Sequence, residues 1–254
     1  MNLVVDIGNS ALKLALYDSA RRVHIERVDA RAWHQRESAL TRLLKERQPA
    51  SATIVSVVPD QARASRQILD EAGISTVLEV TPFIDLPFDI AYETPETLGN
   101  DRIAAAAGAW LHWKDEATTV LAVDAGTATT VEIVSEGTYR GGVIAPGARL
   151  LSTSLANDTA QLPEVALQRT SFTIGRTTHQ AMQSGLYHLF VDGVGGIIER
   201  CISATPGPHK VICTGGWAQL LTEELSVIDH AVPHLVLDGA HALLKRRLVA
   251  SDRD

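Results

Sequence analysis

Cysteine is scarce in this sequence of 254 residues, and no pattern for a disulfide framework or a thiolate metal site is present. Cys201 and Cys213 are the two cysteines, without a CxxC spacing, and the nine histidines show no HExxH or other zinc-type spacing. We therefore expect neither a disulfide-stabilised secreted domain nor a thiolate metal site. This cysteine usage fits a reducing cytoplasm.

Long apolar runs and basic tracts are missing as well. No run of 18 or more apolar residues occurs, which is the length that a membrane-spanning helix needs. The first residues lack the basic region and apolar core of a secretory signal. The formal charge is −7, and no tract rich in Lys and Arg is interleaved with aromatic residues. We expect a cytoplasmic protein that binds neither membranes nor nucleic acid.

Hydrophobic residues make up 45% of the chain, which is enough for one large domain or two ordinary ones. The first eighty residues predict the order strand, strand, strand, helix, strand, helix, strand. The predicted strands cover 3–6, 12–16, 22–28, 52–59 and 74–80, and the predicted helices cover 36–47 and 59–72. This order is typical of a ribonuclease H-like half, in which a mixed sheet has helices on its faces.

The first strand ends on an acid and leads into a tight turn. Asp6 is followed by Gly8, Asn9 and Ser10, and Lys13 lies near the start of the returning strand. Glycine lets the backbone come close to a bound group, the turn offers polar side chains and N–H donors, and Lys13 adds positive charge. This hairpin can hold a phosphate.

The same design recurs almost half the chain later. A second apolar strand leads into Asp124, followed by Gly126 and the hydroxyl groups of Thr127, Thr129 and Thr130. One Asp-x-Gly after a strand is also typical of an ordinary hairpin turn. Two matched copies favour two facing halves that clamp a nucleotide in the cleft between them.

The rest of the chain predicts a second half, and we place the boundary at the polar break 114–117. The predicted elements are strands 131–134, 138–144 and 209–213, a Gly/Pro turn at 141–147, and helices at 148–155, within 175–204, at 217–225 and at 238–249. We predict an α/β protein of two ribonuclease H-like (actin-like ATPase) halves, residues 1–116 and 117–254. Each half is a mixed β-sheet flanked by helices, with the active site in the cleft between them.

Two further segments carry candidate site residues. A proline-containing loop leads to Gly99, Asn100, Asp101 and Arg102 at the start of an Ala-rich helix. Asn100 or Asp101 caps this helix, or the Arg holds an anionic small molecule while Asp101 faces its hydroxyl group.

The glycine pair Gly215 and Gly216 follows a strand and precedes a helix. A glycine pair at such a turn lets the flat adenine ring or the ribose of a nucleotide approach the backbone. A tight turn needed only for packing explains the pair equally well.

Seven short segments, in the order in which they occur, carry a resemblance to a known family. They are DIGNSALK at 6–13, SVVP at 56–59, LGNDR at 98–102, DAGTATT at 124–130, GGVIAPG at 141–147, GRTTHQAMQSG at 175–185 and TGG at 214–216. With them the chain resembles type III pantothenate kinase over almost its whole length. The LGNDR segment is the most specific, because DxGN and DxGT turns occur across the actin-like, sugar kinase and acetate kinase superfamily.

The resemblance implies ATP-dependent phosphorylation of pantothenate to 4′-phosphopantothenate, the first step of coenzyme A biosynthesis. It also implies a homodimer that needs a monovalent cation, potassium or ammonium, and magnesium with ATP. The residues implied to bind ATP are Asp6, Gly8, Asn9, Ser10, Lys13, Thr127, Gly215 and Gly216, and those implied to contact pantothenate are Tyr92, Gly99, Asn100, Asp101, Arg102 and Thr178. Asp101 is the implied general base, Asp124 the ligand of the monovalent cation, and Asp6 a neighbour of magnesium.

Three positions depart from the family pattern. Ser10 stands where the family more often has Thr, Glu132 stands where Asp is expected, and Trp217 is not the residue expected after the glycine pair. Two other interpretations compete with the kinase. One is another phosphotransferase or a phosphatase of the same superfamily, and the other is a non-catalytic accessory or regulatory protein on the same fold. Retention of Asp6, Asp101 and Asp124 in one chain argues against the non-catalytic protein.

Overall fold

The computed structural model describes residues 1–29, 32–159 and 161–251, and it divides the chain into two compact units. One unit contains residues 1–112 together with those from 234 onward, and the other contains residues 113–233. This division differs from the predicted one, 1–116 and 117–254, because the last helix packs with the first unit. The physical reason is that this helix contacts the strands 2–7 and 51–56 of the first sheet.

From β1 to β5 the first unit has the predicted order of strands and helices. Its elements are β1 (Asn2–Ile7), β2 (Leu12–Asp18), β3 (Arg21–Val28), α1 (Trp33–Arg47), β4 (Ser51–Ser56), α2 (Pro59–Glu71), β5 (Thr76–Glu79), β6 (Asp89–Ile90), the 3-10 helix η1 (Pro95–Thr97), α3 (Asn100–Trp113) and α7 (Leu235–Ser251). Its sheet has the order β3-β2-β1-β4-β5, with β1 antiparallel to β2 and parallel to β4. A mixed sheet is therefore confirmed for this unit.

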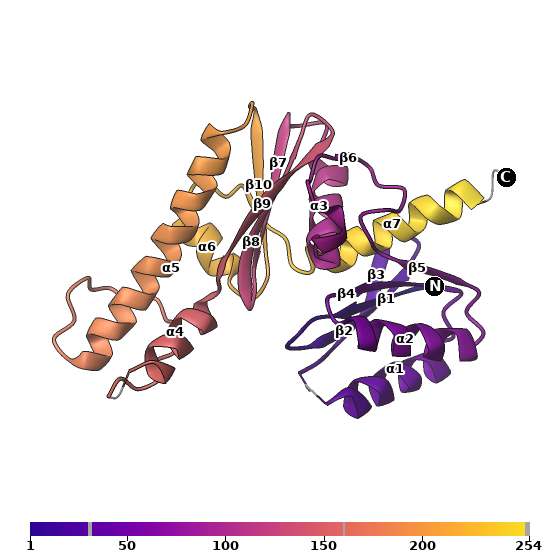
Figure 1. Cartoon of the computed structure of the whole chain (residues 1–254), viewed down its shortest axis with the longest axis horizontal. Helices are drawn as coiled ribbons and strands as arrows, with labels where there is room; N and C mark the ends of the chain where they lie inside the picture. The colour runs from indigo at the N-terminus through magenta and orange to yellow at the C-terminus, as the bar shows by residue number, and fades with distance from the viewer. Residues whose placement is uncertain (30–31, 160, 252–254) are drawn as a thin grey trace. The chain divides into compact units, whose positions relative to one another are not determined.

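The alternation of side chains along β1 and β2 decides what each face of this sheet contacts. Leu3, Val5 and Ile7 of β1 join a core with Leu40 and Leu43 of α1. The alternate residues, which include Asp6, lie on the opposite face, and α7 packs on that side. Figure 1 shows α1 and α2 together on one side of the sheet and α7 on the other. The sheet is thus covered by helices on both faces, and β4 is buried along its whole length, as predicted.

The second unit repeats this arrangement. Its elements are β7 (Thr119–Ala125), β8 (Ala128–Ser135), β9 (Thr138–Pro146), α4 (Ala148–Asn157), α5 (Thr178–Ser203), β10 (His209–Thr214), α6 (Ala218–Glu224) and β11 (His230–Ala231). Its own strands lie in the order β11-β10-β7-β8-β9, with β7 antiparallel to β8 and parallel to β10. Since β7 has the same kinds of neighbour as β1, the repeated design predicted from the two Asp turns is confirmed.

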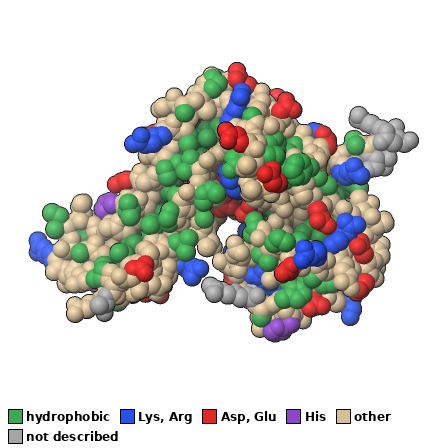
Figure 2. Space-filling model, viewed as in Figure 1, with side chains coloured by type: hydrophobic (Ala, Val, Ile, Leu, Met, Phe, Trp, Pro, Cys, Tyr) green, Lys and Arg blue, Asp and Glu red, His purple; other side chains and the backbone are tan. Residues whose placement is uncertain are grey.

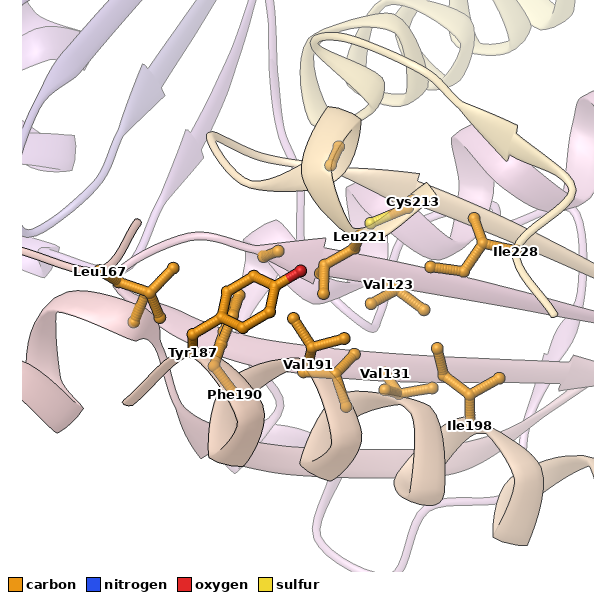
Figure 3. Close-up of a cluster of buried hydrophobic side chains, with 14 of the residues drawn as sticks. Val123, Val131, Leu167, Tyr187, Phe190, Val191, Ile198, Cys213, Leu221 and Ile228 are labelled. Carbon is orange, nitrogen blue, oxygen red and sulfur yellow. The ribbon is translucent and has the colours of Figure 1, made fainter. Parts of the chain in front are cut away.

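The core of the second unit lies between its sheet and the long helix α5. Tyr187, Phe190 and Val191 of α5 point toward Val123 of β7 and Val131 of β8 (Figure 3). The helix is continuous through its glycines. The apolar face of β7 is therefore turned to α5, and Asp124, next to Val123, lies on the other face.

The Gly/Pro turn predicted at 141–147 is wrong for most of that segment, because β9 continues to Pro146. Gly141 has a φ of 107°, next to a shift in the register between β8 and β9 after Ile133. This local irregularity allows Gly141 to keep its positive φ inside the strand. The chain turns only at Gly147, between the end of β9 and the start of α4.

The surface carries charges of both signs. Acidic and basic side chains are interspersed over the face seen in Figure 2. Within residues 1–29, 32–159 and 161–251, none of the helices has the combination of length and hydropathy that crossing a lipid bilayer requires.

Candidate functional site

The hairpin turn between β1 and β2 brings the first set of predicted residues together. The amide of Gly8 donates to the carbonyl oxygen of Ala11 at 3.0 Å, and Asn9 is exposed at the tip. Asp6 and Lys13 are opposite each other in the ladder, with Lys13 Nζ 3.1 Å from Asp6 Oδ2. The turn therefore presents backbone donors beside a Lys whose charge is balanced by a nearly buried carboxylate, 6% exposed.

Arg36 contacts this turn from its buried side, and it is not among the site residues predicted from the sequence. Its side chain is 1% exposed and donates to the carbonyl oxygens of Gly8, at 3.0 Å, and Asn9, at 3.4 Å. It also donates to Gln61 Oε1 at 2.8 Å. One local signal exists: Arg36 lies in the first turn of α1, which has no acidic residue, whereas helix starts favour acidic residues over basic ones.

The first turn of α3 contains the second set of predicted residues. Asn100 Nδ2 donates to the carbonyl oxygen of Ser56 at 3.0 Å, and Asp101 Oδ1 accepts from the amide of Arg102 at 2.8 Å. The Asp101 carboxylate thus accepts a hydrogen bond from the backbone in the first turn of α3, a position that suits an acidic side chain. A Cβ at Gly99 would lie 2.7 Å from Asp101 Oδ1, so glycine leaves room for this carboxylate.

These two sets lie at the same end of the first sheet. Ser56 ends β4 and is paired with Ile7, the last residue of β1. The bond from Asn100 to Ser56 therefore holds the start of α3 beside the strand end that carries the turn. The carboxyl ends of adjacent parallel strands are where open α/β sheets bind ligands. The sequence had given no indication that Asn100 makes this connection.

Arg102 and Tyr92 are neighbours in the same unit. The guanidinium carbon of Arg102 lies 5.9 Å from the centroid of the Tyr92 ring, within cation–π range. Arg102 is 7% exposed, whereas Tyr92 is partly exposed. The aromatic ring thus helps to fix the direction of a nearly buried positive charge.

The turn between β7 and β8 has the same position in the second unit. The amide of Gly126 donates to the carbonyl oxygen of Ala128 at 3.0 Å. The amide of Gly147 donates to the carbonyl oxygen of Thr127 at 3.2 Å. A Cβ at Gly147 would lie 2.4 Å from the Gly126 oxygen. Glycine at 147 therefore permits this close contact, and Thr127 is left exposed.

Asp124 lies against the glycine pair. Gly215 has a φ of 91°, and a Cβ on it would lie 2.5 Å from Asp124 Oδ1. Burial, followed by the negative charge of Asp124, raises the pKa of the Cys213 thiol to about 12. The close approach of Asp124 thus explains why position 215 is a glycine. No atom lies within 4 Å of a Cβ added at Gly216, so packing does not require glycine there. A nucleotide contact at the pair stays a prediction.

The residues present fit the cations that the resemblance implies. Asp124 offers a partly exposed carboxylate at a strand end, and a hard oxygen ligand suits potassium or ammonium through charge and hydrogen bonding. Magnesium commonly takes one or two carboxylates in addition to substrate phosphates. Asp6 is one carboxylate, and one of its oxygens already pairs with Lys13. It therefore suits a site in which the phosphates supply most of the magnesium ligands.

Two of the departures from the family pattern have partners within the second unit. Glu132 is fully buried and accepts a hydrogen bond from the Tyr139 hydroxyl at 2.5 Å. The Trp217 amide donates to the carbonyl oxygen of Ala125 at 3.3 Å, and its ring packs edge-on against Phe190 at 5.9 Å. Both side chains are therefore accommodated by local contacts.

Thr178, the remaining predicted contact of pantothenate, is the first residue of α5. It is exposed, and the preceding Thr177 caps the helix by accepting from the Gln180 amide at 3.2 Å. Thr178 belongs to the second unit, whereas Tyr92 and the residues at the start of α3 belong to the first.

The sequence comparisons with known proteins indicate one family. A sequence model of the type III pantothenate kinase family matches residues 2–200. A type III pantothenate kinase from Chlorobaculum parvum is 31% identical over 255 residues, covering 96% of this chain and 94% of that protein.

Solved structures are similar in fold at much lower identity. A glucokinase from an Antarctic psychrotroph has a TM-score of 0.53 at 11% identity, covering 96% of this chain and 98% of its own. MreB 5 of Spiroplasma citri has a TM-score of 0.54 at 10% identity, with coverages of 99% and 98%. The predicted actin-like fold of two mixed sheets flanked by helices is therefore confirmed.

Proposed function

Since this chain belongs to the type III pantothenate kinase family, we propose that the ends of β1 and β4 carry its reaction site. The activity that goes with the family is the ATP-dependent phosphorylation of pantothenate to 4′-phosphopantothenate, which begins coenzyme A biosynthesis. The chain is a phosphotransferase that acts on an alcohol. One observation carries the placement of the site: the bond from Asn100 to Ser56 holds Asp101 beside the β1–β2 turn.

The β1–β2 turn receives the phosphates of ATP. Phosphoryl transfer requires little covalent chemistry from a protein, but it does require positioning and neutralisation of charge. The turn amides of Asn9 and Ser10 and the ammonium group of Lys13 supply both. Magnesium bound to the ATP phosphates would supply further neutralisation of charge, and Asp6 is the residue that would lie near it.

Asp101 serves as the general base toward the primary hydroxyl of pantothenate. An alcohol is a weak nucleophile at neutral pH, and a carboxylate within hydrogen-bond reach both orients it and accepts its proton. Arg102 attracts the pantothenate carboxylate, and Tyr92, Gly99 and Thr178 complete the contacts. Its position in the first turn of α3, at the end of the sheet that carries the β1–β2 turn, supports this role.

The second unit contributes the cation and further nucleotide contacts. Asp124 would hold potassium or ammonium, and the positive charge would offset repulsion between this carboxylate and the ATP phosphates. Thr127 contacts ATP through its exposed hydroxyl, and Gly215 and Gly216 border the adenosine. The resemblance supports these assignments, as does the position of Asp124 at the end of β7.

The protein acts as a homodimer in the cytoplasm. One stripe of α5 supports the dimer: Leu189 is 61% exposed, and no atom lies within 4 Å of a Cβ added at Gly185 or Gly193. Residues four apart on a helix share a face, so the three form one accessible strip of apolar and small residues. The scarcity of cysteine supports the cytoplasmic location.

A coupled assay of ADP release, with and without pantothenate, tests the activity directly. We expect ADP release to require pantothenate and to match the amount of 4′-phosphopantothenate found by mass spectrometry. ADP release without pantothenate would instead indicate a phosphatase, and release with a sugar in its place would indicate another kinase of this fold. No release under any condition would favour a non-catalytic role.

A further inference from the structure

Arg36 is an unusually buried charge directly below an exposed turn. Its side chain is 1% exposed, although arginine is almost never fully buried unless its charge is paired or its donors are satisfied. The partners of its guanidinium include oxygens from two different parts of the first unit: the carbonyl oxygens of Gly8 and Asn9 and the amide oxygen of Gln61 on α2. The first two belong to consecutive residues of the turn proposed to bind phosphate.

These contacts decide the direction in which the turn amides point. In a trans peptide the C=O group and the following N–H group point to opposite sides. Because the carbonyl oxygen of Gly8 points to Arg36, the N–H of Asn9 points away from it. The carbonyl oxygen of Asn9 also points to Arg36, so the N–H of Ser10 points away as well. Successive N–H groups on one side of a turn form an anion-binding concavity.

The backbone bond of the turn does not by itself decide this direction. The bond from the Gly8 amide to the Ala11 oxygen joins the two ends of the turn. Turns closed at their ends still differ by a flip of the central peptide, as types I and II do. A guanidinium group, with several donors in a rigid fork, can hold two neighbouring carbonyl oxygens at once, whereas an ammonium group acts as a point charge.

We propose that Arg36 is a positioning residue for the nucleotide: it holds the Gly8 and Asn9 carbonyl oxygens inward so that the Asn9 and Ser10 amides face the ATP phosphates. Gln61 holds the guanidinium in this orientation from α2. Arg36 itself does not touch ATP. This inference rests on the proposed role of the turn, and it adds a residue that acts through that turn.

The test compares nucleotide binding with pantothenate binding in folded variants. Calorimetry would measure the dissociation constants of ADP with magnesium and of pantothenate in Arg36→Lys, Arg36→Met and Gln61→Met. We expect Arg36→Lys and Arg36→Met to weaken ADP binding by about tenfold or more, the effect of losing a hydrogen bond from a charged group. Gln61→Met should weaken it less, and pantothenate binding should change less than about twofold, because the start of α3 does not depend on this contact.

Arg42→Met is the matched control. Arg42 lies on the same helix, more than half exposed, and pairs with Glu26 at the surface. Its replacement should leave both dissociation constants and the melting temperature unchanged. If Arg36 only stabilised the fold, its variants would have a lower melting temperature but would bind ADP normally when folded. Normal ADP binding in folded Arg36→Lys, or an equal loss of ADP and pantothenate binding, would overturn the proposal.

A further variant separates this inference from the proposed function. Lys13→Met should weaken ADP binding if the turn receives phosphate. Unchanged binding in Lys13→Met would reject the turn as the phosphate site and the role of Arg36 with it. Weaker binding in Lys13→Met together with normal binding in the Arg36 variants would reject the role of Arg36 alone. If Arg36→Met does not fold, Gln61→Met, which keeps the charge and removes its support, decides the question.

Discussion

Asp101 makes a structural bond at a position proposed for a chemical task. Asp101 bonds the Arg102 amide at a helix start, yet it lies beside the turn proposed to hold ATP. This bond to the helix backbone and the proposed catalytic role therefore do not exclude each other. Kinetic variants can separate the two, because a bond to the backbone affects stability whereas a base affects turnover.

Asp101→Asn keeps the size and shape of the side chain but cannot accept the proton of the pantothenate hydroxyl. We expect kcat to fall by about two orders of magnitude or more, which is typical of losing a general base, with pantothenate binding weakened far less. Arg102→Ala should show the opposite balance, with the larger loss in apparent affinity for pantothenate. Steady-state kinetics and calorimetry on both variants check this. Near-normal turnover in Asp101→Asn would move the base elsewhere, with Asp6 the next candidate.

Asp124 leads to a prediction about salts. If its carboxylate binds a monovalent cation, replacing potassium with sodium should lower the turnover of the wild type sharply. The same exchange should matter little in Asp124→Ala, since that variant lacks the ligand. Rates measured in both salts at equal ionic strength check this. Equal rates for the wild type in potassium and sodium would contradict the assignment.

His241 should make the stability of the first unit depend on pH. This residue of α7 is 4% exposed, stacks on Tyr17 with ring centroids 4.0 Å apart, and accepts from Asn2 Nδ2 at 3.2 Å. Burial, with a smaller effect from the charge of Lys245, lowers the pKa of His241 from 6.5 to about 4. Between these two pH values the unfolded chain binds a proton that the folded chain does not.

The free energy of unfolding should therefore be highest above pH 6.5 and fall as the pH is lowered toward 4, with a contribution from His241 of up to about 3 kcal/mol. His241→Phe keeps the stacked ring but cannot titrate, so the decline should become smaller. Urea unfolding between pH 7 and 4 measures both curves. His179→Gln, at an exposed position of α5, is the control and should keep the slope of the wild type. An unchanged slope in His241→Phe would contradict the prediction.

At the scale of elements, α3 and α7 are packed through glycine. A Cβ at Gly239 of α7 would lie 1.9 Å from the carbonyl oxygen of Ala104 and 2.8 Å from the amide nitrogen of Gly108, both on α3. The two helix backbones therefore touch, and any side chain at position 239 must move one of them. Because α3 begins with Asn100 and Asp101, its packing also concerns the site.

Gly239→Ala should thus destabilise the protein by roughly 1–3 kcal/mol or more, as other overpacking substitutions do, in spite of the higher helix propensity of Ala. Gly196→Ala on α5 is the control, because no atom lies within 4 Å of its added Cβ. That variant should be neutral or more stable by up to about 1 kcal/mol. Thermal or urea unfolding compares the two. A Gly239→Ala protein as stable as the wild type would show that the contact of the helices can relax.

At the scale of the whole molecule, the exposed stripe of α5 predicts the state of assembly. Leu189→Glu places a charge in the middle of the stripe and should convert a dimer into a monomer, since burying an unpaired charge is costly. Light scattering at micromolar concentration gives the mass of each form. Val23→Glu, at a position 49% exposed on β3, is the control and should leave the mass unchanged. A monomeric wild type would contradict the predicted dimer, and a dimeric Leu189→Glu would place the interface elsewhere.

The sequence by itself determined the architecture of each half and the family. Apolar alternation and turn residues encode strands and hairpins over a few neighbouring positions, so β1, β2, β4, α2 and the two Asp turns were predictable from local pattern. The order of elements around Asp6, repeated around Asp124, was then enough to predict the two mixed sheets.

Only the tertiary structure decided which distant groups meet. Tyr17 donates to Asp238 at 2.7 Å across 221 positions of sequence, and contacts of this kind place α7 with the first unit. The bond of Asn100 to Ser56 and the burial of Arg36 under the first turn are equally long-range in origin. A local pattern shows that a side chain is polar or that a helix has an apolar face, but the partner is chosen by packing among all the elements at once. For that reason a phosphate-binding turn could be predicted from the sequence, whereas the burial of Arg36 against its carbonyl oxygens emerged only from the fold.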